Sequence, residues 1–355
     1  MYLKGLGVTP YYLNYKGGNM GIRIGINGFG RIGRYLFRVV HDRRPDLEIV
    51  AVNARAGVDT LAHLLKYDSV HGRFPGEVKV KGNKMVVDER EVTIANITGN
   101  LTKLPWKELG VDIVFETTGK FRDKERNIGH LQAGAKKVII GAPGKGVDNT
   151  IVMGVNEKTY DPERHHIISN ASCTTNCFAP IVKVIHENFI IKKGLMTTVH
   201  GYTMGQRILD GSHKDLRRAR AAALSIVPTT TGAATDTTKV IPELEGKLAA
   251  TAIRVPTPDV AITDFVAEVE RKTNVDKVNS AFKKASEADL KGILGYNEEP
   301  LVSTDYIGSP YSAIVDGPLT KVMDENLVKV FAWYDNEAGF AYRMIDLALY
   351  IGRYL

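Results

Sequence analysis

Apolar residues in the first part of the chain follow two different periods. Residues 22–27 alternate isoleucine with small or polar side chains, which predicts a short buried strand, and a helical pattern follows through Val40. The apolar run 47–53 predicts a second strand, and further strands are expected at 111–116 and 137–140. Strands that alternate with helices in this way predict an α/β fold with a parallel sheet.

A glycine-rich turn joins the first strand to its helix. Gly28, Gly30 and Gly33 give the pattern G-x-G-x-x-G. In dinucleotide-binding folds the first glycine permits a tight turn, the second lets the backbone approach a pyrophosphate, and the third lets the helix pack close to the strand. The N-terminus of the helix would face the phosphates. The pattern therefore predicts a dinucleotide site, and a glycine turn without a ligand is the alternative.

The end of the second strand lacks an acidic residue. NAD-binding folds usually place Asp or Glu there to accept hydrogen bonds from the adenosine ribose. Here Ala54 and Arg55 follow the strand, and the first acid is Asp59. Arg55 could pair with the 2′-phosphate of NADP or simply point to solvent, and this stretch leaves both open. The next strand end, which could contact a cofactor or be an ordinary loop, contains Thr117, Thr118 and Gly119.

One cysteine lies among hydroxyl and amide side chains just before an apolar helical run. The stretch 169–177 reads SNASCTTNC, and Ser172 or Thr174 could cap the helix. A thiol at a helix N-terminus interacts with the helix dipole and with free N–H groups, so its pKa can fall. Cys173 is therefore a candidate nucleophile. Cys177, one turn further on, is expected to be a small buried hydrophobe.

Basic residues supply candidate partners for this thiol and for an anion. His200 ends a β-type run and is a candidate base, whereas the other histidines lie in polar stretches and are expected at the surface. Arg254 lies in an apolar strand, where it needs either an ion pair or a bound anion. Segment 207–220 has five Arg or Lys against two Asp and precedes the turn 228–234, PTTTGAA. Such groups hold phosphate or carboxylate, although a solvated surface or an oligomer loop is the alternative.

Length and composition narrow the class of protein. The 355 residues are 44% hydrophobic and 25% charged, a globular composition that predicts roughly two domains. The net charge of +7 suits an anionic ligand but is too mild to establish nucleic-acid binding, and no nucleic-acid partner is expected. Two cysteines cannot form a disulfide framework, so a cytoplasmic protein is expected. No stretch approaches the ~20 apolar residues of a membrane span.

The first twenty residues resemble neither a signal peptide nor a transit peptide. A strand-like run begins directly after Met20, so Met20 is expected to be the true start. Residues 1–20 are then an extension that is either not native or a short disordered arm.

Seven stretches carry a family resemblance: INGFGRIGR, KYDSVHGRF, SNASCTTNC, HKDLRRARAAA, PTTTGAA, RVPTPDV and WYDNEAG. They extend from Gly21 almost to the C-terminus and resemble phosphorylating glyceraldehyde-3-phosphate dehydrogenase. SNASCTTNC and WYDNE are highly specific in combination. The resemblance implies a homotetramer whose chains contain a Rossmann dinucleotide-binding domain, 21–171 and 337–355, and an α+β catalytic domain, 172–336, with a mostly antiparallel sheet.

The resemblance also implies roles for individual residues. Cys173 would be the nucleophile and His200 the base that activates it. Substrate or inorganic phosphate would be contacted by Ser172, Thr174, Thr203, Arg218, Thr231, Gly232 and Arg254. The cofactor would be contacted by Gly28, Gly30, Arg31, Ile32, Gly33, Ala54, Arg55, Thr117, Thr118, Gly119, Gly211, Ser212 and Asn336. No metal ligand is assigned.

Departures from the family pattern bear on the cofactor. Ala54 replaces the usual Asp, and Gly211-Ser212 replaces the Leu-Pro pair common in NAD-specific members. Both changes resemble members that accept NADP, so NADP is expected to be accepted beside NAD and to be preferred. Phe340 replaces a usual tyrosine near the nicotinamide, and Gly141 replaces a usual serine near the cofactor, which puts those contacts in doubt but not the reaction.

The reaction implied is the reversible oxidation and phosphorylation of glyceraldehyde 3-phosphate to 1,3-bisphosphoglycerate through a cysteine thioester. The nearest alternative is erythrose-4-phosphate dehydrogenase, a relative with the same cysteine and histidine. Its product is an acid and needs no inorganic phosphate site, so the full PTTTGAA turn favours the phosphorylating enzyme. An alternative of another class is a basic RNA-binding protein, which only the net charge supports.

Overall fold

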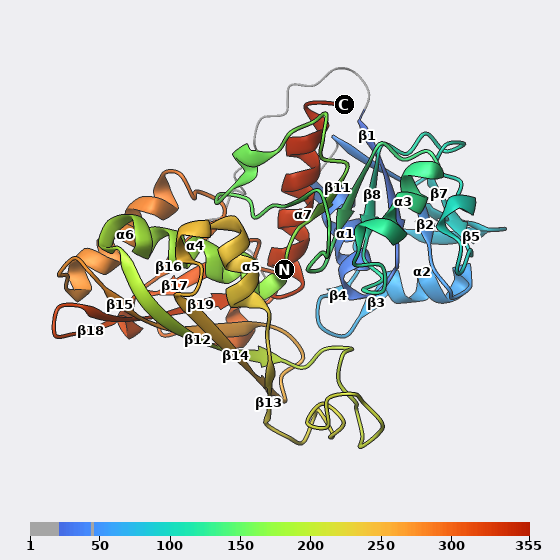
Figure 1. Cartoon of the computed structure of the whole chain (residues 1–355). Coiled ribbons are helices and arrows are strands. Elements are labelled where there is room, and N and C mark those ends of the chain that lie inside the picture. Colours follow the sequence, from blue (N-terminus) through green and yellow to red (C-terminus); the bar gives the residue numbers. More distant parts are fainter. Residues whose placement is uncertain (1–20, 44–45) are drawn as a thin grey trace. The chain divides into compact units, whose positions relative to one another are not determined.

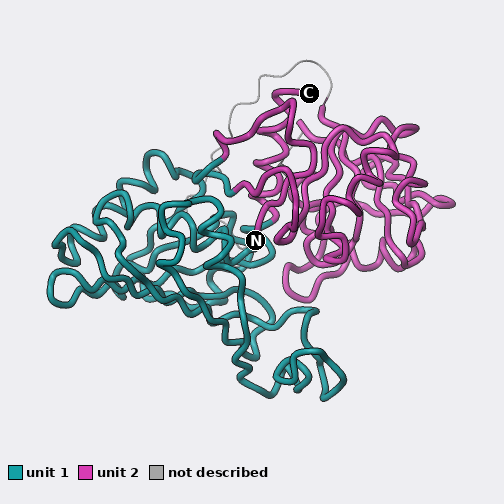
Figure 2. The backbone as a smooth tube through the Cα atoms, viewed as in Figure 1, with its two compact units in different colours: residues 1–11, 152–156, 172–340 teal, residues 12–151, 157–171, 341–355 magenta. Residues whose placement is uncertain are grey.

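The computed structural model describes residues 21–43 and 46–355 (Figure 1). These residues form two compact units (Figure 2). The N-terminal unit comprises residues 21–151 without 44–45, 157–171 and 341–355, and the C-terminal unit comprises 152–156 and 172–340. The predicted extension, 1–20, lies outside the described residues. Within the described part of the chain, no helix is long and apolar enough to cross a membrane.

The N-terminal unit contains one nine-stranded sheet. In spatial order its strands are β10 (Asn149–Thr150), β11 (Ile167–Ser169), β9 (Lys137–Ile140), β8 (Ile113–Glu116), β1 (Ile22–Asn27), β2 (Leu47–Asn53), β7 (Arg90–Ala95), β6 (Lys84–Val87) and β5 (Val78–Lys81). Every pair from β10 to β7 is parallel, and β6 and β5 add an antiparallel hairpin at one edge.

The strand order of this sheet changes direction at its first strand. β1 pairs with β2 on one side and with β8 on the other, so the chain leaves β1 in one direction and later returns in the other. Ligands of open α/β sheets bind at such a switch point, beyond the carboxyl ends of the strands. The sequence therefore predicted both the fold class and the edge at which to look for a cofactor.

The predicted elements of this unit are confirmed with small shifts. β1, β2 and β9 have the predicted bounds, whereas the strand expected at 111–116 begins at Ile113. Central strands are buried on both faces, which is why they are almost continuously apolar. The remaining elements of the unit are α1 (Arg31–Arg43), α2 (Val58–Lys66), β3 (Tyr67–Asp68), β4 (Gly72–Arg73), α3 (Lys124–Gln132) and most of α7 (Ala338–Gly352).

The C-terminal unit contains an eight-stranded, mostly antiparallel sheet, as predicted. Its strands are, in order, β13 (Val227–Thr230), β14 (Leu248–Val255), β12 (Ile191–Gly201), β15 (Ala261–Val269), β19 (Leu327–Tyr334), β17 (Ala313–Asp316) and β16 (Leu294–Asn297), with β18 (Lys321–Met323) beside β19. Only β12–β14 and β16–β17 are parallel pairs. The helices are α4 (Cys173–Phe189), α5 (Ala233–Val240) and α6 (Val275–Glu287).

Helix α4 is the central element of the C-terminal unit. It packs on β12, β15, β17 and β19, and its apolar residues are buried on most sides. Phe178 of α4 meets Phe265 of β15 edge to face, with ring centroids 4.9 Å apart. The alternating burial along β15 gives the sheet one apolar face for this helix. This packing fixes the position of the N-terminus of α4, where Cys173 lies.

Candidate active site

Cys173 is the first residue of α4, as predicted. Of the two candidate caps, Ser172 performs the role: its hydroxyl accepts a hydrogen bond of 3.0 Å from the N–H of Thr175. The first N–H groups of a helix have no partner within the helix. The thiol therefore lies beside donors that can bind an oxyanion on a carbon attached to sulfur.

His200 lies on β12, next to the strand end, and faces the thiol. The distance from Cys173 Sγ to His200 Nε2 is 3.6 Å, and His200 is 2% exposed. Burial and the positive charges of Arg254 and Arg218 outweigh the hydrogen bond to Gly201 and lower the pKa of His200 to about 3. The imidazole is therefore neutral at physiological pH and can act as a base.

The thiol differs from the expectation that its pKa falls. Burial raises the pKa of the Cys173 thiol, and Arg254 and the N–H groups at the start of α4 only partly offset this. The resting thiol consequently keeps its proton, and a nearby base must remove it during attack. Cys177 is buried as predicted; burial also raises the pKa of its thiol.

Sequence reasoning missed Tyr334 as a member of this site. Its hydroxyl lies 2.9 Å from Thr174 Oγ1 and 2.8 Å from Thr198 Oγ1, so it links α4 to β12. Its ring meets His200 edge to face, with centroids 5.8 Å apart. The hydroxyl of Thr174, an expected substrate contact, thus has a structural partner. Tyr334 lies within the WYDNE motif, which was the available signal.

Arg254 lies on β14, directly opposite His200 in the register of β12 and β14. Its Nη1 is 2.7 Å from His200 Nδ1 and 3.1 Å from the carbonyl oxygen of Gly201. Within the described residues Arg254 forms no ion pair, and its buried Nε has no hydrogen-bond partner. Of the two alternatives for Arg254, this geometry favours a bound anion.

A second arginine lies close to the first. Arg218 donates through Nε to Thr229 Oγ1 at 2.9 Å and through Nη2 to the carbonyl oxygen of Thr230 at 3.1 Å. Its charge adds to the effect of burial in lowering the pKa of Arg254. A Cβ built on Gly205 would lie 3.6 Å from Thr203 Oγ1 and 3.9 Å from Arg218 Nη1, so these two predicted phosphate contacts flank one glycine.

The hydroxyl-rich segment 228–234 is not a single turn. Its first part belongs to β13, and α5 begins at Ala233 after Gly232 as N-cap. Thr231 Oγ1 accepts a hydrogen bond of 3.2 Å from the N–H of Ala233. The predicted residues thus lie at the N-terminus of a helix, where N–H groups can hold an anion.

Asn336 has the geometry of an unused ligand contact. It is 7% exposed, and its Oδ1 is buried with no hydrogen-bond partner. Buried polar groups without a partner are rare and call for an explanation. A carboxamide NH₂ of a nicotinamide would satisfy this oxygen, so the residue fits the predicted cofactor.

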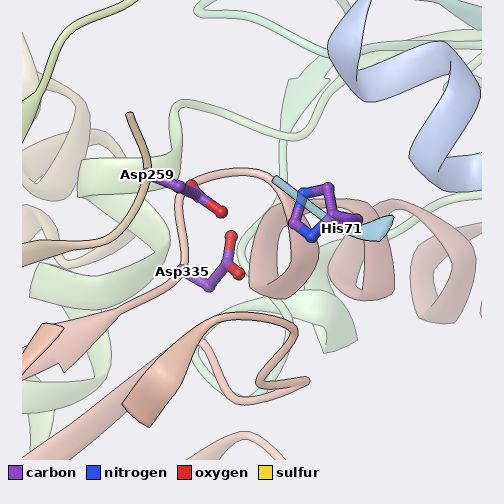
Figure 3. Close-up of side chains that lie close together, drawn as sticks. All are labelled: His71, Asp259 and Asp335. Atoms are coloured by element: carbon purple, nitrogen blue, oxygen red, sulfur yellow. The ribbon is translucent and has the colours of Figure 1, made fainter. Parts of the chain in front are cut away.

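Asp335, which is part of the WYDNE motif, faces a second acidic side chain, Asp259 (Figure 3). The carboxyl groups of Asp259 and Asp335 are directed toward each other (Figure 3). Asp335 accepts hydrogen bonds from the N–H groups of Gly308, Glu337 and Ala338. Burial and the charges of Asp335 and Glu337 raise the pKa of Asp259 to about 9. Asp259 therefore holds a proton at physiological pH.

In the N-terminal unit, the glycine turn has the geometry that the motif predicts. Gly28 has a φ of +99°, and a Cβ there would lie 2.7 Å from the backbone nitrogen of Thr118. A Cβ on Gly33 would lie 2.2 Å from the carbonyl oxygen of Gly28, whereas one on Gly30 would meet nothing within 4 Å. The backbone at Gly30 therefore leaves room for a pyrophosphate.

A buried polar network lies under this turn, and sequence reasoning missed its centre, Glu116. The carboxyl group of Glu116 accepts hydrogen bonds from Asn27 Nδ2, from the N–H of Thr118 at 2.8 Å and from His130 Nε2 at 3.2 Å. Asn53 donates to Asn27 Oδ1 at 2.7 Å. The available signal was a polar residue at the end of an otherwise apolar strand.

This network uses the hydroxyl groups that were expected to contact the cofactor. Thr118 Oγ1 donates to Glu116 at 2.5 Å and accepts from the N–H of Lys120, and Thr117 Oγ1 donates to the carbonyl of Gly28 at 2.6 Å. Gly119, with φ +68°, lets the loop turn away. The hydroxyl groups of both threonines therefore stabilise the glycine turn.

The expectation that the other histidines lie at the surface is wrong for His130. Its side chain is 0% exposed and lies between Trp106 and Glu116. It was missed because α3 is polar in sequence, while its inner face turns toward the sheet.

The remaining predicted cofactor residues lie at exposed or partly exposed positions. Arg55 is exposed and forms no ion pair with a described residue, and Ala54 places no acid beside it. Arg31 forms an ion pair of 2.5 Å with Asp68, so its guanidinium already has a partner; Ile32 follows it in α1. Gly211 and Ser212 lie in the exposed loop of the C-terminal unit.

The sequence matches two domain families in succession. Residues 22–124 match the family described as "Glyceraldehyde 3-phosphate dehydrogenase, NAD binding domain", and residues 172–336 match "Glyceraldehyde 3-phosphate dehydrogenase, C-terminal domain". Residues 125–171 lie between the two matches, and the second match begins at Ser172, directly before Cys173.

Individual relatives are similar over nearly the whole chain. The glyceraldehyde-3-phosphate dehydrogenase of Geobacillus stearothermophilus is 59% identical over 332 residues, which are 94% of this chain and 98% of that protein. Glyceraldehyde-3-phosphate dehydrogenase 1 of Bacillus subtilis strain 168 is 54% identical, over 94% and 99%. The Streptomyces coelicolor protein is 54% identical, over 95% and 100%. None of these matches favours erythrose-4-phosphate dehydrogenase or an RNA-binding protein.

Proposed function

The chain belongs to the glyceraldehyde-3-phosphate dehydrogenase family and is an NAD(P)-dependent oxidoreductase that oxidises and phosphorylates glyceraldehyde 3-phosphate; we propose that it does so through a thioester on Cys173, with His200 as the base. The observation that carries this proposal is the 3.6 Å distance between Cys173 Sγ and His200 Nε2 at the capped N-terminus of α4. A neutral imidazole beside a protonated thiol is the pairing that a cysteine nucleophile needs.

The residues divide the reaction into two steps. Cys173 adds to the aldehyde carbon as His200 Nε2 takes the thiol proton, and the hemithioacetal oxygen lies near the first N–H groups of α4. A nicotinamide cofactor would supply the acceptor for the hydride from that carbon. The imidazolium of His200 gives the thiol proton to the hemithioacetal oxygen, and Nε2 takes this proton back as the hydride leaves the carbon. Inorganic phosphate then attacks the thioester, the C–S bond breaks, and Cys173 becomes free again.

Two anion sites follow from the two arginines. Arg254 and Thr203 would bind the substrate phosphate, and Arg218 would bind the attacking phosphate together with Thr231 and Gly232. The first site is supported because Arg254 forms no ion pair, and its Nε no hydrogen bond, within the described part of the chain. Ser172 and Thr174 would line the substrate carbon, although their hydroxyls also serve the helix cap and Tyr334.

The two sites are separable by kinetics. Arg254→Ala should weaken glyceraldehyde 3-phosphate much more than unphosphorylated glyceraldehyde, because only the first carries the phosphate. Arg218→Ala should instead raise the concentration of inorganic phosphate needed for half-maximal rate. An equal loss for both aldehydes in Arg254→Ala would mean that the arginine is structural.

NADP is the cofactor that the residues favour. Ala54 removes the acid that would repel a 2′-phosphate, the Arg55 guanidinium forms no ion pair with any residue that the structure describes, and Ser212 adds a hydroxyl. Two charge-assisted contacts could shift the preference by roughly 10²-fold. The test compares kcat/KM for NADP and NAD in the wild type and in Ala54→Asp. A wild-type enzyme at least tenfold better with NAD would contradict the preference, and an Ala54→Asp variant with full NADP activity would remove its proposed cause.

We also propose that the protein is a cytoplasmic homotetramer. Its two domains would be residues 21–171 with 337–355, and residues 172–336. Support for the oligomer comes from exposed apolar side chains in the segment between β12 and β13. They are Met204, Ile208, Leu209, Leu216, Leu224 and Ile226. A patch of this kind is typical of a protein interface. Light scattering coupled to gel filtration should give four chains per particle, and a monomer would contradict the assignment.

A further inference from the structure

The loop after β2 is held by an asparagine from the neighbouring strand end. This loop, the ribose loop (residues 54–57), follows the carboxyl end of β2, where NAD(P)-binding folds hold the adenosine ribose. Its side chains are short except for that of Arg55. Asn96 Nδ2 donates to the carbonyl oxygens of Arg55 and Ala56, each at 3.1 Å. Among the described residues, no other side chain forms a hydrogen bond with the ribose loop.

Asn96 is itself fixed at the carboxyl end of β7, which pairs with β2 (Figure 1). The residue before it, Ala95, lies opposite Asn53 in the register and accepts a hydrogen bond of 3.2 Å from the N–H of Ala54. The residue after it, Ile97, donates to Asn53 Oδ1 at 2.9 Å and accepts from Asn53 Nδ2 at 3.1 Å. Both neighbours of Asn96 are therefore bound to the end of β2, and its amide is held beside the ribose loop.

The two hydrogen bonds from Asn96 supply what the ribose loop lacks. An amide NH₂ has two protons, one for each carbonyl oxygen. Gly57 has the widest backbone freedom of any residue type, so the loop does not hold one conformation by itself. A peptide carbonyl oxygen also carries a partial negative charge, which would repel a phosphate dianion. Bonded to Asn96, the oxygens of Arg55 and Ala56 have this charge partly offset, and the backbone that carries Arg55 is fixed.

We infer that Asn96 is a positioning residue for cofactor choice, because it fixes the ribose loop so that Arg55 meets the 2′-phosphate of NADP. This inference rests on the proposed preference for NADP. Arg55 is exposed and forms no ion pair with a described residue, so its guanidinium is placed by its backbone alone. A backbone that is fixed before binding removes an entropy cost that the complex would otherwise carry. Asn96 acts through Arg55, so its effect should depend on that guanidinium.

Binding of two nucleotides to the cofactor-free enzyme isolates the 2′-phosphate. Isothermal titration calorimetry gives the Kd for adenosine 2′,5′-bisphosphate and for AMP, which lacks only the 2′-phosphate. The wild type should bind the bisphosphate more tightly. Asn96→Ala should reduce this preference by about fivefold or more, the effect of restoring backbone freedom to the loop. The Kd for AMP should stay within about twofold of the wild-type value, which also shows that the variant is folded.

Asn297→Ala is the matched control, because Asn297 Nδ2 also donates to a loop carbonyl, that of Glu299 at 2.6 Å, but in the C-terminal unit. This variant should keep the wild-type preference for the bisphosphate. An equal loss of affinity for both nucleotides in Asn96→Ala would overturn the inference, because Asn96 would then support the whole adenosine site and not the choice between cofactors.

A double-mutant cycle tests whether Asn96 acts through Arg55. Arg55→Ala should lower the preference for the bisphosphate by about tenfold or more, because a charge-assisted contact is lost. Adding Asn96→Ala to Arg55→Ala should then change the preference by less than about twofold, because no guanidinium is left to position. A further loss as large as that in the wild-type background would overturn the inference, because Asn96 would then act on the phosphate by another route.

Failure of this inference is distinguishable from failure of the proposed cofactor preference. A wild type that binds both nucleotides equally would overturn the preference for NADP and the role of Asn96 with it. A wild type that prefers the bisphosphate, loses this preference in Arg55→Ala and keeps it in Asn96→Ala would overturn only the role of Asn96. The thioester chemistry of Cys173 enters neither result.

Discussion

Two buried histidines, one in each unit, have opposite hydrogen-bond environments. Trp106 Nε1, which can only donate, lies 3.0 Å from Nδ1 of His130. The carboxyl group of Glu116, which accepts, lies 3.2 Å from Nε2 of the same ring. These partners assign one tautomer. His200 has a donor and an acceptor competing for a single atom, and its other nitrogen faces a thiol.

The difference teaches which polar groups support the fold and which perform chemistry. In the network around Glu116, donors from Asn27, Thr118 and His130 all meet a carboxyl oxygen, so one arrangement satisfies them together. Around His200 the hydrogen bonds cannot all form at once, because Nδ1 faces both a donor and an acceptor. A satisfied network specifies one arrangement, and a partly satisfied one leaves a choice.

The largest effect should come from removing the thiol. Cys173→Ser leaves His200 with a hydroxyl that is a far weaker nucleophile, so turnover should fall by roughly 10⁴-fold or more. Cofactor binding, measured by fluorescence titration, should stay near the wild-type value, because Glu116 and the glycine turn lie in the N-terminal unit. Turnover within tenfold of the wild type would remove Cys173 from its role.

Removal of the base should have the next largest effect. His200→Asn should lower the rate by ~10²–10⁴ and slow the alkylation of Cys173 near neutral pH, because no group then takes the thiol proton. The readout is the iodoacetamide rate against pH. An unchanged pH profile would mean that the 3.6 Å contact has no role in activation.

A smaller effect is expected at the satisfied network. Glu116→Gln replaces one carboxyl oxygen, to which two donors point, with an amide NH₂. The groups left unpaired should lower the free energy of unfolding by about 1–3 kcal/mol. The loop at Thr118 should lose its anchor, so the Kd for NADPH should rise by about tenfold. Alkylation of Cys173 without cofactor should not change. Glu125→Gln, on the exposed side of α3, is the matched control, and an equal effect in both variants would contradict the argument.

The same contrast explains how much could be predicted from the sequence. The strands, the glycine turn and a helix cap at Ser172 or Thr174 depend on neighbouring residues, and the sequence predicted them within a few positions. Tyr334 meets Thr174 across 160 positions, and Glu116 meets Asn27 across 89. Such pairs depend on the sheet register, which periodicity does not give. The prediction that the pKa of Cys173 falls was wrong for the same reason, because the burial that raises it is a tertiary property.

The smallest effect should appear in stability. Asp259 is 2% exposed, and burial together with Asp335 and Glu337 raises its pKa to about 9, whereas an unfolded Asp has a pKa of about 3.9. Between these values the folded chain binds a proton that the unfolded chain has lost. Stability should therefore fall as pH rises through this window and change no further above it.

Asp259→Asn tests this pair because an amide donates to Asp335 without a titratable proton. The variant should match or exceed the wild type at pH 9, by about 1–3 kcal/mol, and its stability should change less between pH 6 and pH 9. The measurement is the midpoint of urea unfolding at one fixed protein concentration, since assembly makes midpoints concentration-dependent. Asp276→Asn, at an exposed position on α6, should keep the wild-type pH dependence. Parallel curves for Asp259→Asn and the wild type would show that Asp259 shares no proton with Asp335.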